Sequence, residues 1–325
     1  MKWMAVDEPT GLDALRLAEV ATPEPGPGQV RVRIAACGVN FADTLMVKGQ
    51  YQVRPEPPFA PGIEIAGRVD ALGAGVTQLR EGQPVAAIVG HGGLAEQAVL
   101  DARLALPLPE TMDLVEAAAF PVAYGTSHIG LDHRAGLRAG ETLVVHGAGG
   151  GVGLTAVEIG KRLGARVIAT AGSQAKLDAA RAKGADLTID YASEDVRQAI
   201  KDATDGRGAD VIYDPVGGAA FDASLRAIAF EGRIVVVGFA SGTIPQIPAN
   251  ILLVKNVSAV GLHWGLYADK RPEVLVRSLQ TLMGWYAAGE IRPHVSATYP
   301  LADAGRALAD LAERRATGKV VVTMG

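Results

Sequence analysis

A glycine-rich turn between an apolar strand and a helix-forming segment constrains this chain more than any other feature. Residues 143–145 are apolar, and Gly147, Gly150 and Gly153 follow at intervals of three residues. Glycines at this spacing allow a sharp turn, a close approach of the backbone to a pyrophosphate, and tight packing of the next helix on the sheet. The N–H groups in the first turn of that helix would face the phosphate.

The residues that follow the turn provide the context that a glycine cluster needs. Residues 154–163 are helix-forming, Gly164 ends that segment, and residues 165–170 form a second apolar run. An isolated cluster would be an ordinary tight turn, whereas this strand–helix–strand context is typical of a dinucleotide-binding site. The residues expected at the cofactor phosphates are Gly147, Gly150, Gly151, Val152 and Gly153.

The end of the second apolar run indicates which dinucleotide is bound. An NAD site usually has an acidic residue about 20 residues after the glycines, where it bonds the ribose 2′-hydroxyl. Here no acid occurs before Asp178, and Ser173 and Lys176 occupy the segment instead. A hydroxyl and an ammonium suit a 2′-phosphate, so NADPH is the predicted cofactor. The alternative for Lys176 is a solvated position on the next helix.

The pattern of apolar, glycine and proline residues changes twice along the chain, and the chain is predicted to be an α/β protein. Up to about residue 120, short strand-like runs such as 30–36, 65–72 and 85–89 alternate with glycine and proline, which predicts a small β-barrel. From about 122 to 261, strands and helices alternate as in a doubly wound sheet. The strands expected there are 142–146, 166–170, 187–190, 211–214, 233–238 and 257–260. After residue 261, apolar residues at helical spacing predict helices with core-facing stripes, and a closing strand covers 319–324.

Composition favours a globular enzyme and argues against nucleic-acid or membrane partners. The 31 basic and 35 acidic residues are spread without long runs, so no surface is suited to capture DNA or anionic lipid. No signal-peptide core and no apolar run of spanning length is found, so a cytoplasmic location is expected. The single cysteine, Cys37, excludes an intrachain disulfide and a cysteine-rich zinc lobe.

Three segments together carry a family resemblance. Residues 37–43 (CGVNFAD), residues 61–67 (PGIEIAG) and the glycine turn preceded by His146 are similar to the zinc-free quinone oxidoreductases of the medium-chain dehydrogenase/reductase superfamily. The resemblance implies a GroES-like β-barrel catalytic domain, residues 1–121 and 263–325, and an inserted doubly wound (Rossmann) NADPH-binding domain, residues 122–262. It also implies an active site in the cleft between them. It further implies a homodimer joined edge to edge through residues 257–260.

The resemblance also bears on metal binding. Zinc alcohol dehydrogenases of the same superfamily carry ligands where this chain has Asn40, Ile63 and a residue near Ala118. These side chains cannot provide the three nitrogen, sulfur or carboxylate ligands of a catalytic zinc, so none is expected. The neighbouring acid, Glu64, is expected to be structural and held by a backbone or basic partner.

Without a Lewis acid the substrate must be electrophilic by itself. A quinone satisfies this requirement, because hydride transfer from NADPH gives a delocalised hydroquinone anion. The predicted function is therefore an NADPH-dependent quinone oxidoreductase. A zinc-free NADPH-dependent reductase of enones and other α,β-unsaturated carbonyl compounds is the alternative. A protein that retains NADPH without turnover is a third alternative.

The remaining site residues are each weighed against a structural role. Asn40 matches a family position beside the nicotinamide, where it would bond a cofactor hydroxyl or substrate oxygen, or else it caps the next helix. Tyr51 resembles a tyrosine bordering the substrate cleft and is a candidate proton donor, although a half-buried loop tyrosine is equally expected. Tyr191 resembles the residue that packs at the 2′-phosphate. The residues expected near the nicotinamide half are Gly238, Phe239 and Ser241.

Overall fold

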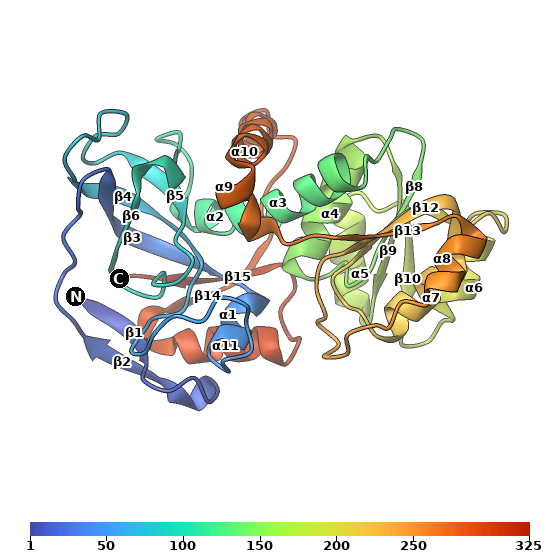
Figure 1. Cartoon of the computed structure of the whole chain (residues 1–325), viewed down its shortest axis with the longest axis horizontal. Coiled ribbons are helices and arrows are strands. Elements are labelled where there is room, and N and C mark those ends of the chain that lie inside the picture. Colours follow the sequence, from blue (N-terminus) through green and yellow to red (C-terminus); the bar gives the residue numbers. More distant parts are fainter. The chain divides into compact units, whose positions relative to one another are not determined.

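The computed structural model describes residues 1–325 and divides them into two compact units. The first contains Met1–Val122 and Pro293–Gly325, and the second contains Ala123–Arg292. In Figure 1 the blue N-terminal and red C-terminal segments both belong to the first unit. The second unit is therefore an insertion in the first.

The first unit is built on β-sheet. Its main sheet has the order β14-β15-β3-β4-β5-β7, with β6 on β3, and β1 and β2 form a separate pair. The strands are β1 (Lys2–Val6), β2 (Leu15–Glu19), β3 (Gln29–Val39), β4 (Glu64–Leu72), β5 (Pro84–Ile88), β6 (Gln97–Asp101), β7 (Ala105–Pro107), β14 (Val295–Pro300) and β15 (Lys319–Thr323). The helices are η1 (Leu12–Ala14), α1 (Phe41–Met46), η2 (Ala102–Leu104), α2 (Leu114–Ala118), η5 (Leu301–Asp303) and α11 (Ala304–Ala312). Helix α3 (Pro121–His128) carries the chain into the second unit.

Alternating side chains explain the central strand of this unit. In the first half of β3, Val30, Val32 and Ile34 are buried while arginines alternate with them, as expected for a strand with one face on a core. The last strand, β15, pairs antiparallel with the second half of β3, with Val321 opposite Gly38. Figure 1 shows this red strand beside the blue one. The C-terminal segment thus completes the sheet that the N-terminal segment begins.

The second unit is a parallel sheet of the order β10-β9-β8-β11-β12-β13. Its strands are β8 (Thr142–Val145), β9 (Arg166–Ala171), β10 (Leu187–Asp190), β11 (Ala209–Asp214), β12 (Ile228–Val236) and β13 (Ser258–Gly261). Its helices are η3 (Ile129–Arg134), α4 (Gly151–Arg162), α5 (Gln174–Ala182), α6 (Val196–Asp202), α7 (Ala219–Ala227), α8 (Ala249–Lys255), η4 (Trp264–Leu266), α9 (Tyr267–Lys270) and α10 (Pro272–Ala287). The strand order reverses between β8 and β11, and ligands of such sheets bind at the carboxyl ends of the strands beside this reversal.

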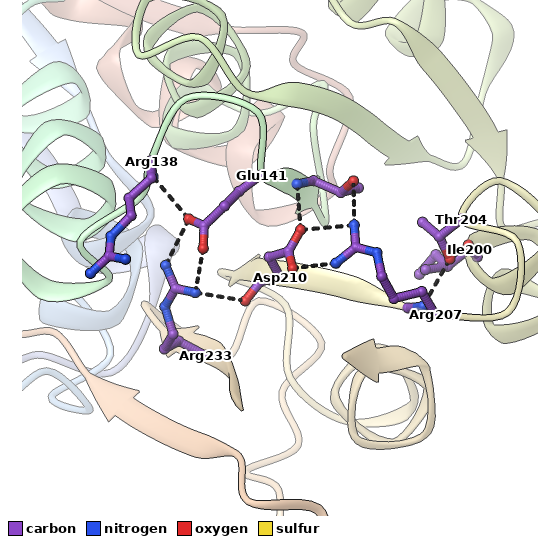
Figure 2. A network of polar contacts seen from close by, with 9 residues as sticks. Arg138, Glu141, Ile200, Thr204, Arg207, Asp210 and Arg233 are labelled. Carbon is purple, nitrogen blue, oxygen red and sulfur yellow. Dashed lines mark hydrogen bonds and ion pairs between the residues drawn. The ribbon is translucent and has the colours of Figure 1, made fainter. Parts of the chain in front are cut away.

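An ion-pair network holds the amino ends of the central strands, away from that ligand-binding edge. Arg233 donates two hydrogen bonds of 2.8 Å to Glu141, directly before β8, and Asp210 of β11 accepts from the N–H of Thr142 at 2.7 Å. Arg207 pairs with Asp210 on its other side (Figure 2). These groups are only about one-fifth exposed or less, apart from Arg207. The network ties the starts of β8 and β11 to Arg233, where β12 begins its regular pairing with β11.

The observed division of the chain differs from the expected domain boundaries at residues 263–292. These residues were expected in the first domain, but the compact units place them in the second. The physical reason is a polar and apolar contact between α10 and α3, in which Ser278 lies 2.9 Å from the ring of His128 and Trp285 packs against that ring. No helix of the protein is both long enough and apolar enough to cross a membrane.

Candidate cofactor site and active site

The glycine turn adopts a backbone that other residues would disrupt. It connects β8 to α4, and Gly147 has a φ of +57°, in the left-handed region. A Cβ atom at Gly153 would lie 2.2 Å from the carbonyl oxygen of Gly147 and 2.7 Å from the Cα of Ala148. Glycine at 153 therefore lets the first turn of α4 pack directly on the glycine turn.

The amino end of α4 presents free hydrogen-bond donors. The N–H of Gly150 bonds within the turn, but those of Gly151, Val152 and Gly153 have no backbone acceptor, as expected in the first turn of a helix. No acidic residue lies in this turn. Three donors at the positive end of a 12-residue helix fit the pyrophosphate of a dinucleotide.

The residues predicted for the 2′-phosphate lie around the carboxyl end of β9. A Cβ at Gly149 would lie 2.5 to 2.9 Å from three stem carbons of Lys176, so this stem packs on the glycine turn. A Cβ at Gly172 would lie 2.5 Å from the ring of Tyr191, which is otherwise half exposed. Ser173 is the N-cap residue of α5, yet its side chain makes no capping bond. Its hydroxyl therefore remains available to a ligand.

The loop after β12 meets the loop after β11 at the same edge of the sheet. The N–H of Ser241 donates to the carbonyl of Val216 at 2.9 Å, and Phe239 packs against Gly217. A Cβ at Gly238 would lie 3.4 Å from the carbonyl oxygen of Pro215. The Ser241 hydroxyl accepts from a nearby N–H and so stabilises its own turn. The structure thus places all three residues beside the strand-order reversal.

Two polar residues at this edge are buried and were not among the ligand-binding residues assigned from the sequence. The ring of His146 bridges Thr170 (Nδ1, 3.0 Å) and Ser224 (Nε2, 2.8 Å), and burial lowers the pKa of this histidine. Asp214 accepts two N–H bonds from the turn after β11 through one carboxylate oxygen, while its other oxygen is buried without a partner. A polar residue that ends an otherwise apolar strand was the available signal for both.

In the first unit, Asn40 belongs to a buried ionic cluster. Its Nδ2 donates to Glu64 at 2.8 Å, and its Oδ1 accepts from Lys319 at 2.8 Å. Glu64 and Lys319 form an ion pair of 2.7 Å, with exposed side-chain fractions of 0% and 5%. Glu64 also accepts from the N–H of Val122 at 2.8 Å. The structural role expected for Glu64 is confirmed, with both a basic and a backbone partner, whereas Lys319 was missed.

Two ionisable groups lie next to this cluster. Asp43 is fully buried and accepts from the N–H groups of Asn40 and Gly62 at 2.8 and 2.9 Å. Burial raises the pKa of Asp43 to about 7, against the opposing effect of these two donors. Tyr51 packs on the core of the unit, and burial followed by the charge of Asp43 raises its pKa. The structure gives the Tyr51 hydroxyl no hydrogen-bond partner.

The positions that carry zinc ligands in the alcohol dehydrogenases have other contacts. Asn40 is engaged with Glu64 and Lys319, Ile63 packs against the apolar core, and the carbonyl of Ala118 lies against Gly38. No group of three histidine, cysteine, aspartate or glutamate side chains is arranged to hold a metal ion.

Comparisons with known proteins agree with the architecture. The alcohol dehydrogenase GroES-like domain matches residues 26–110, and the domain described as zinc-binding dehydrogenase matches residues 151–280. The chain is 43% identical over 305 residues to a quinone oxidoreductase-like protein 2 homolog of Nematostella vectensis, which covers 93% of this chain and 83% of that protein.

Solved structures of quinone oxidoreductases have the same fold. That of Pseudomonas syringae pv. Tomato DC3000 has a TM-score of 0.93 at 33% identity and 99% coverage of both chains. That of Escherichia coli, complexed with NADPH, has a TM-score of 0.92 at 29% identity, covering 99% of this chain and 100% of that one. The predicted combination of a GroES-like domain with a doubly wound nucleotide-binding domain is confirmed. The chain is an oxidoreductase that belongs to the quinone oxidoreductase family of the medium-chain dehydrogenase/reductase superfamily.

Proposed function

We propose that this protein is an NADPH-dependent quinone oxidoreductase that transfers hydride to a quinone without zinc. The observation that carries the proposal is the pairing of three free N–H donors at α4 with Ser173 and Lys176 at the end of β9. The donors suit a pyrophosphate, and the hydroxyl and ammonium suit a 2′-phosphate. The NADPH complex of the Escherichia coli relative supports the same cofactor.

Each part of the cofactor would have its own residues. Gly147, Gly150 and Gly153 shape the turn, and the N–H groups of Gly151 and Val152 would hold the pyrophosphate. Lys176, Ser173 and Tyr191 would hold the adenosine end. Gly238, Phe239 and Ser241 would border the nicotinamide half, and Asn40 would accept from a cofactor hydroxyl.

The chemistry asks little more of the protein than positioning. Bound NADPH supplies a hydride to the acceptor. A reduced quinone is stabilised by its own aromaticity, so neither a Lewis acid nor a strong proton donor is needed. The zinc-free assignment rests on the donor set, because Asn40, Ile63 and Ala118 offer an engaged amide, a hydrocarbon and a methyl group.

A steady-state assay tests the proposal. Oxidation of NADPH is followed with a benzoquinone or naphthoquinone, with an enone, and with no acceptor, and is repeated with NADH. We expect the fastest turnover with NADPH and a quinone. Equal use of NADH, or no turnover with any acceptor, would refute the proposal, and the latter result would favour a protein that binds NADPH without turnover.

One observation favours the enone reductase as a second candidate. The Tyr51 hydroxyl has no internal partner, so it is free to protonate or hydrogen-bond a reduced carbonyl compound. Faster turnover of an enone than of every quinone tested would establish this alternative.

We further propose that the protein is a cytoplasmic homodimer joined along β13, the edge strand of the parallel sheet. Helix α8, directly before β13, exposes Leu253 (76%) and Val254 (74%), and Phe230 of β12 is 71% exposed. Large apolar side chains that are this exposed are typical of an interface. Sedimentation should show a dimer, and Val254→Glu with Leu253→Glu should shift it to monomer.

A further inference from the structure

The chemistry of the partners fixes the orientation of the Asn40 amide. An ammonium only donates hydrogen bonds, so the atom facing Lys319 must be Oδ1. A carboxylate only accepts, so the atom facing Glu64 must be Nδ2. The ammonium of the ion pair thus bonds the oxygen of the Asn40 amide, and the carboxylate bonds its nitrogen. In the reversed orientation, two donors would face each other at Lys319 and two acceptors at Glu64.

Every hydrogen atom of the Lys319 ammonium and of the Asn40 NH2 group points to an acceptor. The three donors of Lys319 point to the carbonyl of Val39 (2.9 Å), to Asn40 Oδ1 (2.8 Å) and to Glu64 Oε1 (2.7 Å). The two donors of Asn40 Nδ2 point to Glu64 Oε1 (2.8 Å) and to the carbonyl of Gly38 (3.1 Å). Asn40 Oδ1 accepts one of these bonds, from Lys319, and its second lone pair lies on a side chain that is partly exposed.

The surroundings keep the cluster from rearranging. The second oxygen of Glu64 is held by the N–H of Val122 at 2.8 Å. A Cβ at Gly38 would lie 2.8 Å from Glu64 Oε1 and 2.1 Å from the carbonyl of Ala118, so the backbone closes tightly over the carboxylate. Asn40 itself is fixed from the other side, because its N–H donates to Asp43 at 2.8 Å.

We propose that Lys319 and Glu64 are positioning residues that hold the Asn40 side chain as an acceptor only, so that it binds a hydroxyl group and donates nothing to the substrate carbonyl. This inference rests on the proposed NADPH-dependent function and narrows the role of Asn40 within it. The ribose hydroxyls of NADPH are donors that fit such an acceptor, whereas a quinone has no O–H group. Disturbing the cluster should therefore weaken cofactor binding and leave the binding of the acceptor unchanged.

Two variants test the inference. Lys319→Met removes the ammonium but leaves the Glu64 carboxylate buried without its cation, which can prevent folding. The second variant, Lys319→Met with Glu64→Gln, removes both charges. In it the carbonyl of the new glutamine would accept from the N–H of Val122, and its NH2 group would then face Asn40 and reverse that amide. Lys319→Arg retains the charge and should restore part of the native behaviour. Arg31→Met, which breaks the mostly buried pair of Arg31 with Asp70 in the same unit, is the matched control.

Three measurements are made on each folded variant. Fluorescence titration gives the dissociation constant of NADPH, steady-state kinetics give the KM values of NADPH and of a benzoquinone, and NMR gives the solvent exchange of the Asn40 NH2 group. We expect the double variant, in which the Asn40 amide is reversed, to bind NADPH about tenfold more weakly, the effect of one lost hydrogen bond, with less than a twofold change in the benzoquinone KM. The Asn40 NH2 group should exchange slowly in the native protein and in Arg31→Met, and faster in Lys319→Met.

Unchanged NADPH affinity in the double variant, or an effect confined to the benzoquinone KM, would overturn the inference. Failure of the proposed function has a different signature, because the native protein would then oxidise no NADPH with any acceptor. The titration and the amide exchange do not depend on turnover and decide the inference in either case.

Discussion

Replacing Lys176 by methionine and by alanine separates the two contributions of this side chain. Its stem packs on Gly149 of the glycine turn, and its ammonium is the proposed partner of the 2′-phosphate. Methionine retains most of the stem and removes the charge, whereas alanine removes both. A charge-assisted hydrogen bond contributes about 1.5–3 kcal/mol, and solvent screening at this partly exposed position places the value near the lower limit.

The expected effect on NADPH follows from that value. About 1.4 kcal/mol corresponds to a factor of ten, so Lys176→Met should raise the KM of NADPH roughly tenfold. NADH has no 2′-phosphate, and its KM should change less than about twofold in the same variant. Lys176→Ala should add a smaller loss for both cofactors, because the glycine turn loses the packing of the stem.

The assay is initial-rate kinetics at saturating benzoquinone, with each cofactor varied at low and high salt. Raising the salt concentration should weaken NADPH use in the native protein more than in Lys176→Met. An equal rise in both cofactor constants in Lys176→Met would refute the assignment of the phosphate to this residue. So would a native protein that does not distinguish the two cofactors.

Four further outcomes are expected. Gly153→Ala should destabilise the protein by about 1–3 kcal/mol and abolish NADPH binding in a titration, because the added methyl group would lie 2.2 Å from the carbonyl of Gly147. The bonds from Arg233 lower the pKa of Glu141 from its usual 4.5, so its stabilisation is complete above that pH and is lost as the pH falls through the lowered folded-state value. Denaturant unfolding at a series of pH values should show this loss in the native protein. In Glu141→Gln the free energy of unfolding should fall less steeply as the pH is lowered. Tyr51→Phe should slow turnover of a small quinone by less than about tenfold, and a loss of several hundredfold would contradict the quinone assignment. Elemental analysis should find no stoichiometric zinc, and prolonged treatment with a chelator should leave turnover intact. If zinc were catalytic, removing it with the chelator would abolish turnover.

The parallel sheet could be predicted from the sequence because each of its strands is a short apolar run between turn residues. All six strands lie where they were expected, and β13 is at the sheet edge. The exception in detail is β12, which begins at Ile228, several residues before the expected 233. Its first part contains Glu231 with a φ of +58° and a shift in register against β11, and such an irregularity breaks the alternating pattern.

Long-range pairing limited what could be predicted of the rest. The apolar stripe around Leu275 and Leu282 predicts a helix with a buried face, but periodicity does not say which part of the protein covers that face. Lys319 is 255 residues away from Glu64, and a lysine between a glycine and a valine run suggests a solvated strand end. Only the pairing of β15 with β3, and of β3 with β4, brings the ammonium to the carboxylate. The glycine turn needed no such information, because its residues are contiguous.

The insertion of one unit into the other has a consequence during protein synthesis. The ribosome releases β3 and β4 early, but their partner β15 emerges only after the whole second unit. The second unit is contiguous and can fold as soon as it is outside the ribosome. The first unit must wait, with the second half of β3 lacking its β15 partner and Glu64 without its cation. A stop codon that removes residues 319–325 should therefore leave the second unit able to fold. The first unit, whose synthesis begins earlier, should remain incompletely folded because it lacks β15.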